Sequence, residues 1–290
     1  MDLIYIMKHL NTDKKCVKYL EKKRWHGTPT CPYCDSKKSS PKSLRHTCLA
    51  CNNSYSVTVG TILQDSNLPL QKWLIAIVLI LSAKKGISSL QLSRDLSINK
   101  NTAWLLQMKI RKALNEQEGE LLEGIIEADE TFIGGKINNH YPTGKKTSNP
   151  SHLQPVLGMV ERKGKVMARV IPAPLREVIM PLVREYITSS STLVTDGSQA
   201  YFPAKNHFNA HKVISKASKI FKRGIYHTNT IEGFWSLLKR AIIGQYHKIN
   251  LHYLQVYIDE ICFKYNYRNS QDKGFEVVLN NLFNENLATN

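Results

Sequence analysis

Four residues in the second half of the chain have the types and spacing to act on one substrate. Glu232 and Lys239 lie two turns apart on the same face of a helix predicted over residues 227–240. Asp129 and Asp196 each stand at the end of a predicted strand. Carboxylate oxygens bind hard divalent cations, and a lysine ammonium binds phosphate as a point charge. The set suits metal-dependent chemistry on a substrate that contains phosphate.

The helix that carries Glu232 and Lys239 is predicted from its apolar spacing. Steps of three and four residues place one buried stripe on it, made of Ile231, Phe234, Trp235, Leu238 and Ile242. The same steps define a neighbouring face with Glu232, Ser236, Lys239 and Ile243. Asn229 and Glu232 also have capping-box spacing, in which Asn229 caps the helix and Glu232 folds back to its amide. Glu232 therefore has two interpretations, as a metal ligand and as part of a cap.

The composition is typical of a globular protein that binds a polyanion. The 290 residues are 42% apolar, which allows packed cores and about two domains. Forty Lys and Arg against 23 Asp and Glu give a formal charge of +17, so nucleic acid is the leading partner. A solvated basic surface or an anionic membrane surface remains the alternative.

The first 20 residues mix Asp, Lys and His with apolar residues, which is not the pattern of a secretory signal. The longest apolar run, residues 73–81, is far shorter than the roughly 20 residues of a membrane span and predicts a buried helix. We therefore expect a cytoplasmic protein. In that compartment the six cysteines favour metal binding or free thiols over disulfides.

Four of these cysteines form two Cys-x2-Cys pairs, Cys31 with Cys34 and Cys48 with Cys51. Each short turn presents two sulfurs and the hairpin between them brings the pairs together, so the spacing suits tetrahedral zinc. Because protein fills all four positions, the predicted zinc ion is structural. Four thiols without metal are the alternative. Cys16 and Cys262 are predicted to be buried apolar side chains.

The rest of the first half is predicted to be mostly helical. Residues 1–28 form a basic helical segment, residues 54–60 alternate like a last ribbon strand, and residues 68–83 form one helix. Residues 86–96 and 100–112, with a short break between them, resemble a helix-turn-helix. Its second helix would enter a major groove, and an ordinary three-helix unit is the alternative. The candidates for reading or positioning DNA there are Lys100, Asn101, Thr102, Gln107 and Lys109.

In the second half, three strands, a helix and a fourth strand follow one another. The predicted ranges are 125–133, 155–160 and 166–171 for the strands, 175–187 for the helix and 191–195 for the last strand. Residues 136–151 are predicted to form a basic loop that is mobile or faces DNA. A helix over 251–267 is followed by a polar, frayed tail.

Two further acids flank Asp129. Glu127 shares its side of the strand, whereas Glu130 points the other way and is predicted to lie at the surface, although either could be an auxiliary acid. Residues 205–226 interleave cations with His207, Phe208, His211, Phe221 and Tyr226, as in segments that hold a nucleic-acid strand; a solvated basic face is the alternative. The DNA-binding candidates from this segment and the following helix are Lys219, Lys222, Arg223 and Arg240.

The chain resembles the DDE transposases with an RNase H-like catalytic fold, specifically the bacterial insertion-sequence transposases with an N-terminal zinc ribbon. The resemblance covers roughly residues 20–270. It rests on the two Cys-x2-Cys pairs, Ala128-Asp-Glu-Thr-Phe-Ile-Gly-Gly135, Thr195-Asp-Gly-Ser198, the helix with Glu232 and Tyr257-Ile-Asp-Glu-Ile-Cys-Phe-Lys-Tyr-Asn266. Some members have Asn as the third acidic residue, so Asn229 is the alternative to Glu232 at that position.

The resemblance implies cleavage and joining of DNA with two magnesium or manganese ions. Asp129 would bridge both ions, Asp196 and Glu232 would each hold one, and Lys239 would contact a phosphate beside the scissile bond. His227 and Asn229 are auxiliary candidates for orienting DNA or a metal-bound water. The implied partners are insertion-sequence terminal repeats and target DNA, bound by a homo-oligomer at the bacterial nucleoid.

We therefore expect an α+β chain with an RNase H-like domain built on a mixed sheet. The predicted divisions are 1–60 (helix and zinc ribbon), 61–120 (helix-turn-helix region), 124–270 (catalytic domain) and 271–290 (tail). Two alternatives remain. One is a DNA-binding regulator whose second domain is not catalytic, and the other is an RNase H-like structure-specific nuclease.

Overall fold

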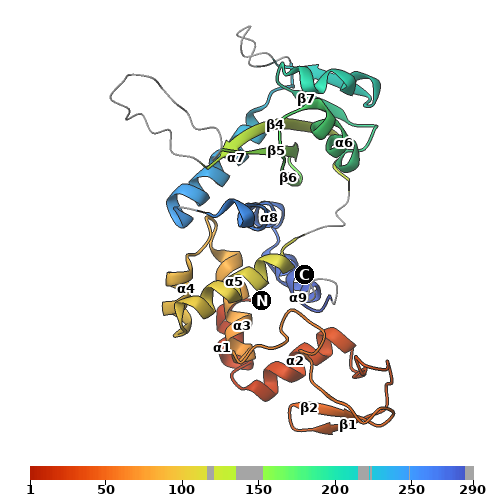
Figure 1. Ribbon diagram of the computed structural model, residues 1–290, viewed down its shortest axis with the longest axis vertical. Helices are drawn as coiled ribbons and strands as arrows, with labels where there is room; N and C mark the ends of the chain where they lie inside the picture. Colours follow the sequence, from red (N-terminus) through yellow and green to blue (C-terminus); the bar gives the residue numbers. More distant parts are fainter. Residues whose placement is uncertain (116–120, 135–152, 215–221, 223, 248, 285–290) are drawn as a thin grey trace. The chain divides into compact units, whose positions relative to one another are not determined.

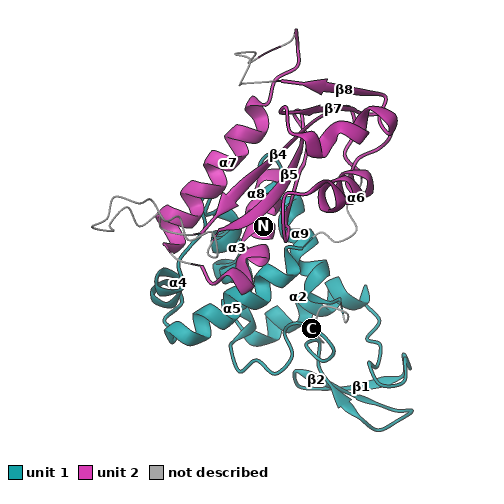
Figure 2. Ribbon diagram, turned by 45° about the horizontal axis from the view of Figure 1, so that its top comes forward, with its two compact units in different colours: residues 1–115, 267–290 teal, residues 116–266 magenta. Residues whose placement is uncertain are grey.

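The computed structural model describes residues 1–115, 121–134, 153–214, 222, 224–247 and 249–284. The chain divides into two compact units, which Figure 2 shows in different colours. Unit 1 consists of Met1–Asn115 together with Tyr267–Asn290, and unit 2 consists of Glu116–Asn266. The chain therefore leaves unit 1, forms unit 2 and returns to complete unit 1.

The N-terminal part of unit 1 contains two helices and a three-stranded antiparallel ribbon in the order β1-β2-β3. These elements are α1 (Leu3–His9), α2 (Asp13–Trp25), β1 (Ser39–Lys42), β2 (Arg45–Cys48) and β3 (Ser54–Tyr55) (Figure 1). The last strand ends well before the predicted residue 60. The carbonyls of Val57 and Val59 accept hydrogen bonds from the Arg24 guanidinium at 2.9 and 2.7 Å, instead of pairing with a strand.

Unit 1 also contains the helical elements α3 (Leu70–Ser82), α4 (Ser89–Leu96), α5 (Lys100–Ala113) and α9 (Gln271–Leu282). Only three residues join α4 to α5. Ser97 among them adopts a left-handed conformation with φ of 49°, and Asn99 caps α5 by accepting from the Asn101 amide at 2.8 Å. The predicted pair of helices with a tight turn is confirmed.

The prediction of a polar, frayed tail after residue 270 is wrong for residues 271–282, which form α9. Phe275, Val278, Leu279 and Leu282 recur at helical spacing and are all buried. Hydrogen bonds from Asn281 to the Ala113 carbonyl and from the Ile62 amide to the Leu282 carbonyl attach α9 to the rest of unit 1. The polar residues that suggested a tail occupy the exposed side of this helix.

Unit 2 is built on a five-stranded mixed sheet in the order β6-β5-β4-β7-β8. The strands are β4 (Ile125–Ile133), β5 (Gln154–Glu161), β6 (Val166–Val170), β7 (Thr192–Thr195) and β8 (Ala210–Val213). β4, β5 and β6 pair antiparallel, whereas β7 and β8 run parallel to β4. This is the arrangement expected of an RNase H-like domain, and the α+β class is confirmed.

The helical elements of unit 2 are α6 (Arg176–Tyr186), η2 (Gln199–Asn206), α7 (Asn229–Ala241), the π-helical η3 (Ile242–Tyr246), η4 (Leu251–Tyr253) and α8 (Leu254–Asn266). They pack on both faces of the sheet (Figure 1). Ile126 and Ala128 of β4 belong to the core formed with α6 and η2, whereas Ile133 belongs to the core formed with α7 and α8. Odd-numbered residues of β4 therefore face α7.

The predicted order of three strands, a helix and a strand is confirmed, but β8 was not predicted. Its two apolar side chains, Ala210 and Val213, stand at its ends with the basic His211 and Lys212 between them, so no apolar alternation marks it. Across the described residues, no helix combines the length and the apolar character needed to cross a membrane.

Candidate functional site

Asp129 and Asp196 lie at neighbouring positions in the sheet of unit 2. Ala128 of β4 pairs with Thr195 of β7, and the two strands are parallel, so the two aspartates follow paired residues. Both side chains are half-buried. Asp129 Oδ2 accepts a hydrogen bond from Trp235 Nε1 at 3.0 Å, and Asp196 Oδ1 accepts one from the Ser198 amide at 2.9 Å. The structure thus brings these two predicted carboxylates together.

Helix α7 presents the predicted face with Glu232 and Lys239. Its apolar stripe of Ile231, Phe234, Trp235, Leu238 and Ile242 is buried, as predicted. Glu232, Ser236 and Lys239 are exposed. Because Trp235 reaches Asp129 from this helix, α7 lies beside the middle of β4.

The predicted capping box of Asn229 with Glu232 is wrong. Helix α7 begins at Asn229, an exposed residue, and the N-cap residue is Thr228. The Thr228 hydroxyl makes no capping hydrogen bond to the helix amides; it donates to Glu232 Oε1 at 2.9 Å. Glu232 is therefore oriented by the residue one turn before it and does not serve as a cap.

The free amides of α7 are bound instead by Glu127 of β4. Its Oε2 accepts from the Thr230 amide at 2.7 Å and the Ile231 amide at 3.0 Å. Its Oε1 accepts from the Thr230 hydroxyl at 2.8 Å and from the Arg162 guanidinium at 2.8 Å, and it lies 3.3 Å from His227 Nδ1. Glu127 is fully buried. A buried carboxylate requires partners of this kind. A glutamate inside a predicted buried strand is the sequence feature that could have indicated these contacts.

Glu130 was predicted to lie at the surface, and this prediction is wrong. Glu130 is half-buried on the opposite face of β4, where its Oε1 accepts from the hydroxyl of the buried Tyr201 at 2.5 Å. Burial, together with the charges of Asp196 and Asp129, raises the pKa of Glu130 to about 7, although the hydrogen bond from Tyr201 acts to lower it. The charges of Asp129, Glu130 and Asp196 therefore act on one another near the middle of β4.

The acidic residues suit divalent cations by their chemistry, since magnesium prefers carboxylate oxygens. Asp129, Asp196 and Glu232 do not form a group whose ligand atoms lie within 4.8 Å of one another; in the described part of the chain, the four cysteines are the group that does so. Two ions roughly 3.5–4 Å apart and bridged by one carboxylate do not require the outer two to meet. By ligand type, the three carboxylates suit hard divalent cations.

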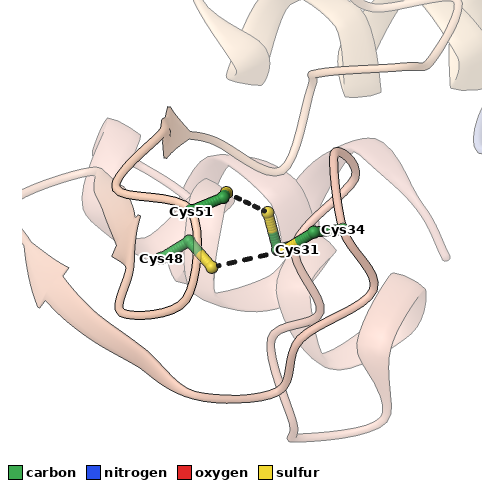
Figure 3. Close-up of side chains that lie close together, drawn as sticks. All are labelled: Cys31, Cys34, Cys48 and Cys51. Atoms are coloured by element: carbon green, nitrogen blue, oxygen red, sulfur yellow. Dashed lines mark hydrogen bonds between the residues drawn. The ribbon is translucent and has the colours of Figure 1, made fainter.

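The four cysteines Cys31, Cys34, Cys48 and Cys51 converge in the ribbon of unit 1, as Figure 3 shows. The sulfurs of Cys31 and Cys51 are 3.7 Å apart, and those of Cys34 and Cys48 are 3.6 Å apart. A zinc tetrahedron with bonds of about 2.3 Å has sulfur separations of about 3.8 Å, so the cluster supports a structural zinc ion. Hydrogen bonds from the backbone amides of Cys51 and Ala50 lower the pKa of Cys48 to about 6.

An aromatic cluster packs beside these cysteines. Tyr55 is buried with Cys31 and Cys48, and the rings of Trp25, His46 and Tyr55 lie 5.6 to 5.7 Å apart. Because Trp25 ends α2, the cluster attaches the ribbon to that helix. Cys16 and Cys262 lie apart from the metal cluster and are buried, as predicted. None of the six cysteines forms a disulfide.

The start of helix α5 carries three of the predicted DNA-binding residues in exposed positions: Lys100, Asn101 and Thr102. Lys109 is half-buried and donates to the Gln64 carbonyl at 3.1 Å. The prediction that Gln107 reads DNA is wrong. Gln107 is buried, accepts from the Ser89 hydroxyl and donates to the Ile87 carbonyl, so it fastens α4 to α5.

The basic segment before α7 is described in part. Lys219, Arg223 and Phe221 lie outside the described residues, whereas Lys222 and Arg240 are exposed. The prediction that Phe208 and His211 contact nucleic-acid bases is wrong. Phe208 packs in the core with α6, and His211 Nε2 lies 2.8 Å from the Thr195 hydroxyl, where burial lowers its pKa. The predicted loop over 136–151 also lies outside the described residues.

Replacing Gly158 with Ala is expected to destabilise unit 2 by displacing Trp235. Gly158 pairs with Asp129, and a Cβ there would lie 2.4 Å from Trp235 Cη2 and 3.0 Å from Ile231 Cδ1. Overpacking of this kind costs about 1–3 kcal/mol, which urea unfolding would measure. Gly233→Ala is the control, because its Cβ meets nothing within 4 Å and Ala favours helix by up to ~1 kcal/mol. Equal stability of Gly158→Ala and the wild type would contradict the expected clash.

Two family models match the chain. The model of the ISXO2-like transposase domain matches residues 121–266, and that of the transposase zinc-ribbon domain matches residues 11–54. A relative from Halobacterium salinarum, named "Uncharacterized protein in transposable element ISH50", is 24% identical over an alignment of 253 positions that covers 79% of this chain and 83% of the relative.

Two solved structures align with the chain at low TM-scores. The pre-cleavage Mos1 transpososome aligns over 97% of this chain and 96% of that chain, at 10% identity and a TM-score of 0.28. The Mos1 strand transfer complex aligns over 72% of this chain and 78% of that chain, at 9% identity and a TM-score of 0.21.

Proposed function

The chain belongs to the ISXO2-like transposase family, and we propose that it cleaves and joins DNA at the ends of an insertion sequence by two-metal phosphoryl transfer. The observation that carries the proposal is the neighbouring placement of Asp129 and Asp196, next to the helix that presents Glu232. Three carboxylates from two strands and a helix are a suitable set for divalent cations at a phosphodiester.

In this proposal Asp129 would bind both ions, and Asp196 and Glu232 would each bind one. The ions, magnesium or manganese, would activate the attacking oxygen and stabilise the leaving oxygen. Thr228 orients the Glu232 carboxylate through its hydroxyl. Lys239, exposed on the same helix face, would bind a phosphate next to the scissile bond. His227 and Asn229 stand at the start of this helix and remain auxiliary candidates for orienting DNA.

Delivery of DNA to this site would depend on unit 1 and on charge. The exposed start of α5 would enter a major groove, and Lys222 and Arg240 would contact the backbone near α7. The net charge of +17 supplies the long-range attraction. Because an element has two ends that must be cut together, we also propose that a homo-oligomer assembles on the DNA.

A strand-transfer assay tests the proposal. The purified chain would be incubated with pre-cleaved ends that carry a 3′-hydroxyl, a supercoiled target plasmid and magnesium. The expected product is a plasmid joined to the end, which ligation-dependent amplification would detect. The reaction should fail in EDTA and with ends that carry a 3′-dideoxy nucleotide, since the attacking hydroxyl is then missing.

Two results would support the alternatives instead. Cleavage of uncut ends without joining would indicate a structure-specific nuclease. Tight, sequence-selective binding of ends with neither cleavage nor joining in magnesium or manganese would indicate a DNA-binding regulator.

A further inference from the structure

The cap of helix α7 comes from a strand that is distant in sequence. Helices commonly satisfy their first amides with the side chain of the N-cap residue. In α7 that residue is Thr228, whose hydroxyl is directed to Glu232 instead. Glu127 of β4 accepts from the amides of Thr230 and Ile231 in its place.

The location of Glu127 connects two parts of the candidate site. It precedes Asp129 by two residues on the same strand and faces the same side of the sheet, so both reach α7. It binds the first turn of the helix, in which Glu232 is the fourth residue. Movement of α7 away from β4 would therefore break the hydrogen bonds of Glu127 and that between Trp235 and Asp129.

Burial and charge strengthen this connection. Glu127 has no exposed surface, its negative charge lies at the positive end of the helix, and Arg162 compensates it from the β5–β6 turn. Arg162 also donates to the Ile225 carbonyl at 2.6 Å and the His227 carbonyl at 3.3 Å. The segment that leads into α7 is thus held by the same ion pair.

We propose that Glu127 is a positioning residue that holds Glu232 at its working place relative to Asp129. The inference rests on the proposed function, because it assigns both carboxylates to one metal-dependent site. Residues that orient metal ligands typically change metal affinity or activity by 10- to 100-fold when they are replaced.

The test replaces Glu127 with Gln in the full chain. The side-chain amide then faces donors from Arg162 and from the helix, so the cap is weakened while the volume is kept. Hydrogen exchange should become at least about 10-fold faster in peptides covering residues 227–235, with little change in β5 and β6. The magnesium concentration for half-maximal cleavage should rise about 10- to 100-fold, while binding of end DNA is unchanged.

Two further variants complete the test. Thr230→Val removes one hydroxyl donor to Glu127 and keeps the backbone amides, so it should give a smaller change in the same direction and serves if Glu127→Gln does not fold. Glu185→Gln, an exposed acid at the end of α6, is the control for loss of a charge and should match the wild type.

An unchanged magnesium requirement in Glu127→Gln and Thr230→Val would overturn the inference. A uniform rise in exchange across the whole sheet would overturn it too, since it would show a role in global stability alone. Failure of the wild-type chain to cleave in magnesium or manganese would instead count against the proposed function, and the exchange experiment would still report whether Glu127 holds α7.

Discussion

Asp129→Asn is expected to abolish metal-dependent cleavage of element ends, with a loss of at least about 1,000-fold, or ~4 kcal/mol of transition-state stabilisation. The amide keeps the size of the side chain and the oxygen that accepts from Trp235 Nε1, but it loses the charge that two cations would share. Asp196→Asn is expected to act in the same way. Gel-based cleavage of a labelled end in magnesium would measure the rate.

The same experiment on Glu232→Gln separates catalysis from helix stability. A Gln carbonyl can still accept from the Thr228 hydroxyl, and Glu127 continues to cap α7, so the helix should keep its stability. Cleavage should fall as in Asp129→Asn. Asn229→Ala tests the other candidate for the third ligand, and a large loss there with an active Glu232→Gln would move the assignment to Asn229.

End binding is the control for all these variants, and Glu185→Gln is the control for charge. Electrophoretic mobility shifts with end DNA should match the wild type, because the replaced carboxylates would act on the reacting phosphate and not on affinity. Cleavage at the wild-type rate by any variant would remove that residue from the site.

Cys48→Ser is expected to unfold the ribbon and to remove the zinc ion. Zinc contributes apparent binding free energies of about 10–16 kcal/mol in small zinc domains, far more than a ribbon of three short strands supplies by itself. The aromatic cluster of Trp25, His46 and Tyr55 would lose its support from Cys31 and Cys48. Metal analysis by mass spectrometry and hydrogen exchange over residues 26–60 would report both losses.

Cys16→Ser serves as the matched control, since this buried cysteine lies apart from the cluster. It should retain zinc, although loss of an apolar buried group should lower the melting temperature. Chelation of the wild type should reproduce the Cys48→Ser exchange pattern in unit 1 and leave unit 2 protected. A purified wild-type chain without zinc but with a protected ribbon would contradict the structural role of the metal.

Local patterns in the sequence were sufficient for much of the fold. The apolar stripe of α7, the pair of helices α4 and α5, and the strands β4 to β7 were predicted because their spacing follows helical or strand periodicity. The polar composition of residues 271–282 concealed a stripe of four apolar residues, and β8 has too few apolar residues for a pattern. Helix α9 and strand β8 are stabilised by contacts with other elements, which a local sequence pattern does not show.

The polar contacts of the site could not be predicted in this way. Asn229 and Glu232 have the spacing of a capping box. In the structure Thr228 is the N-cap residue and donates to Glu232, and a glutamate from β4 binds the helix amides. Glu130 pointed away from Asp129 as predicted, but η2 covers that face and buries it against Tyr201. Gln107 had the polarity of a DNA-reading residue and instead connects two helices. In each case the partner comes from another element.

The sequence by itself determined which residues can bind metal and the order of the elements that carry them, because ligand chemistry and hydrophobic periodicity are properties of short segments. The tertiary structure alone decided how Asp129 and Glu232 are held. That arrangement depends on burying Glu127 against the start of α7 and Trp235 against Asp129. A buried charge requires partners wherever the fold can supply them, and here they come from residues far along the chain.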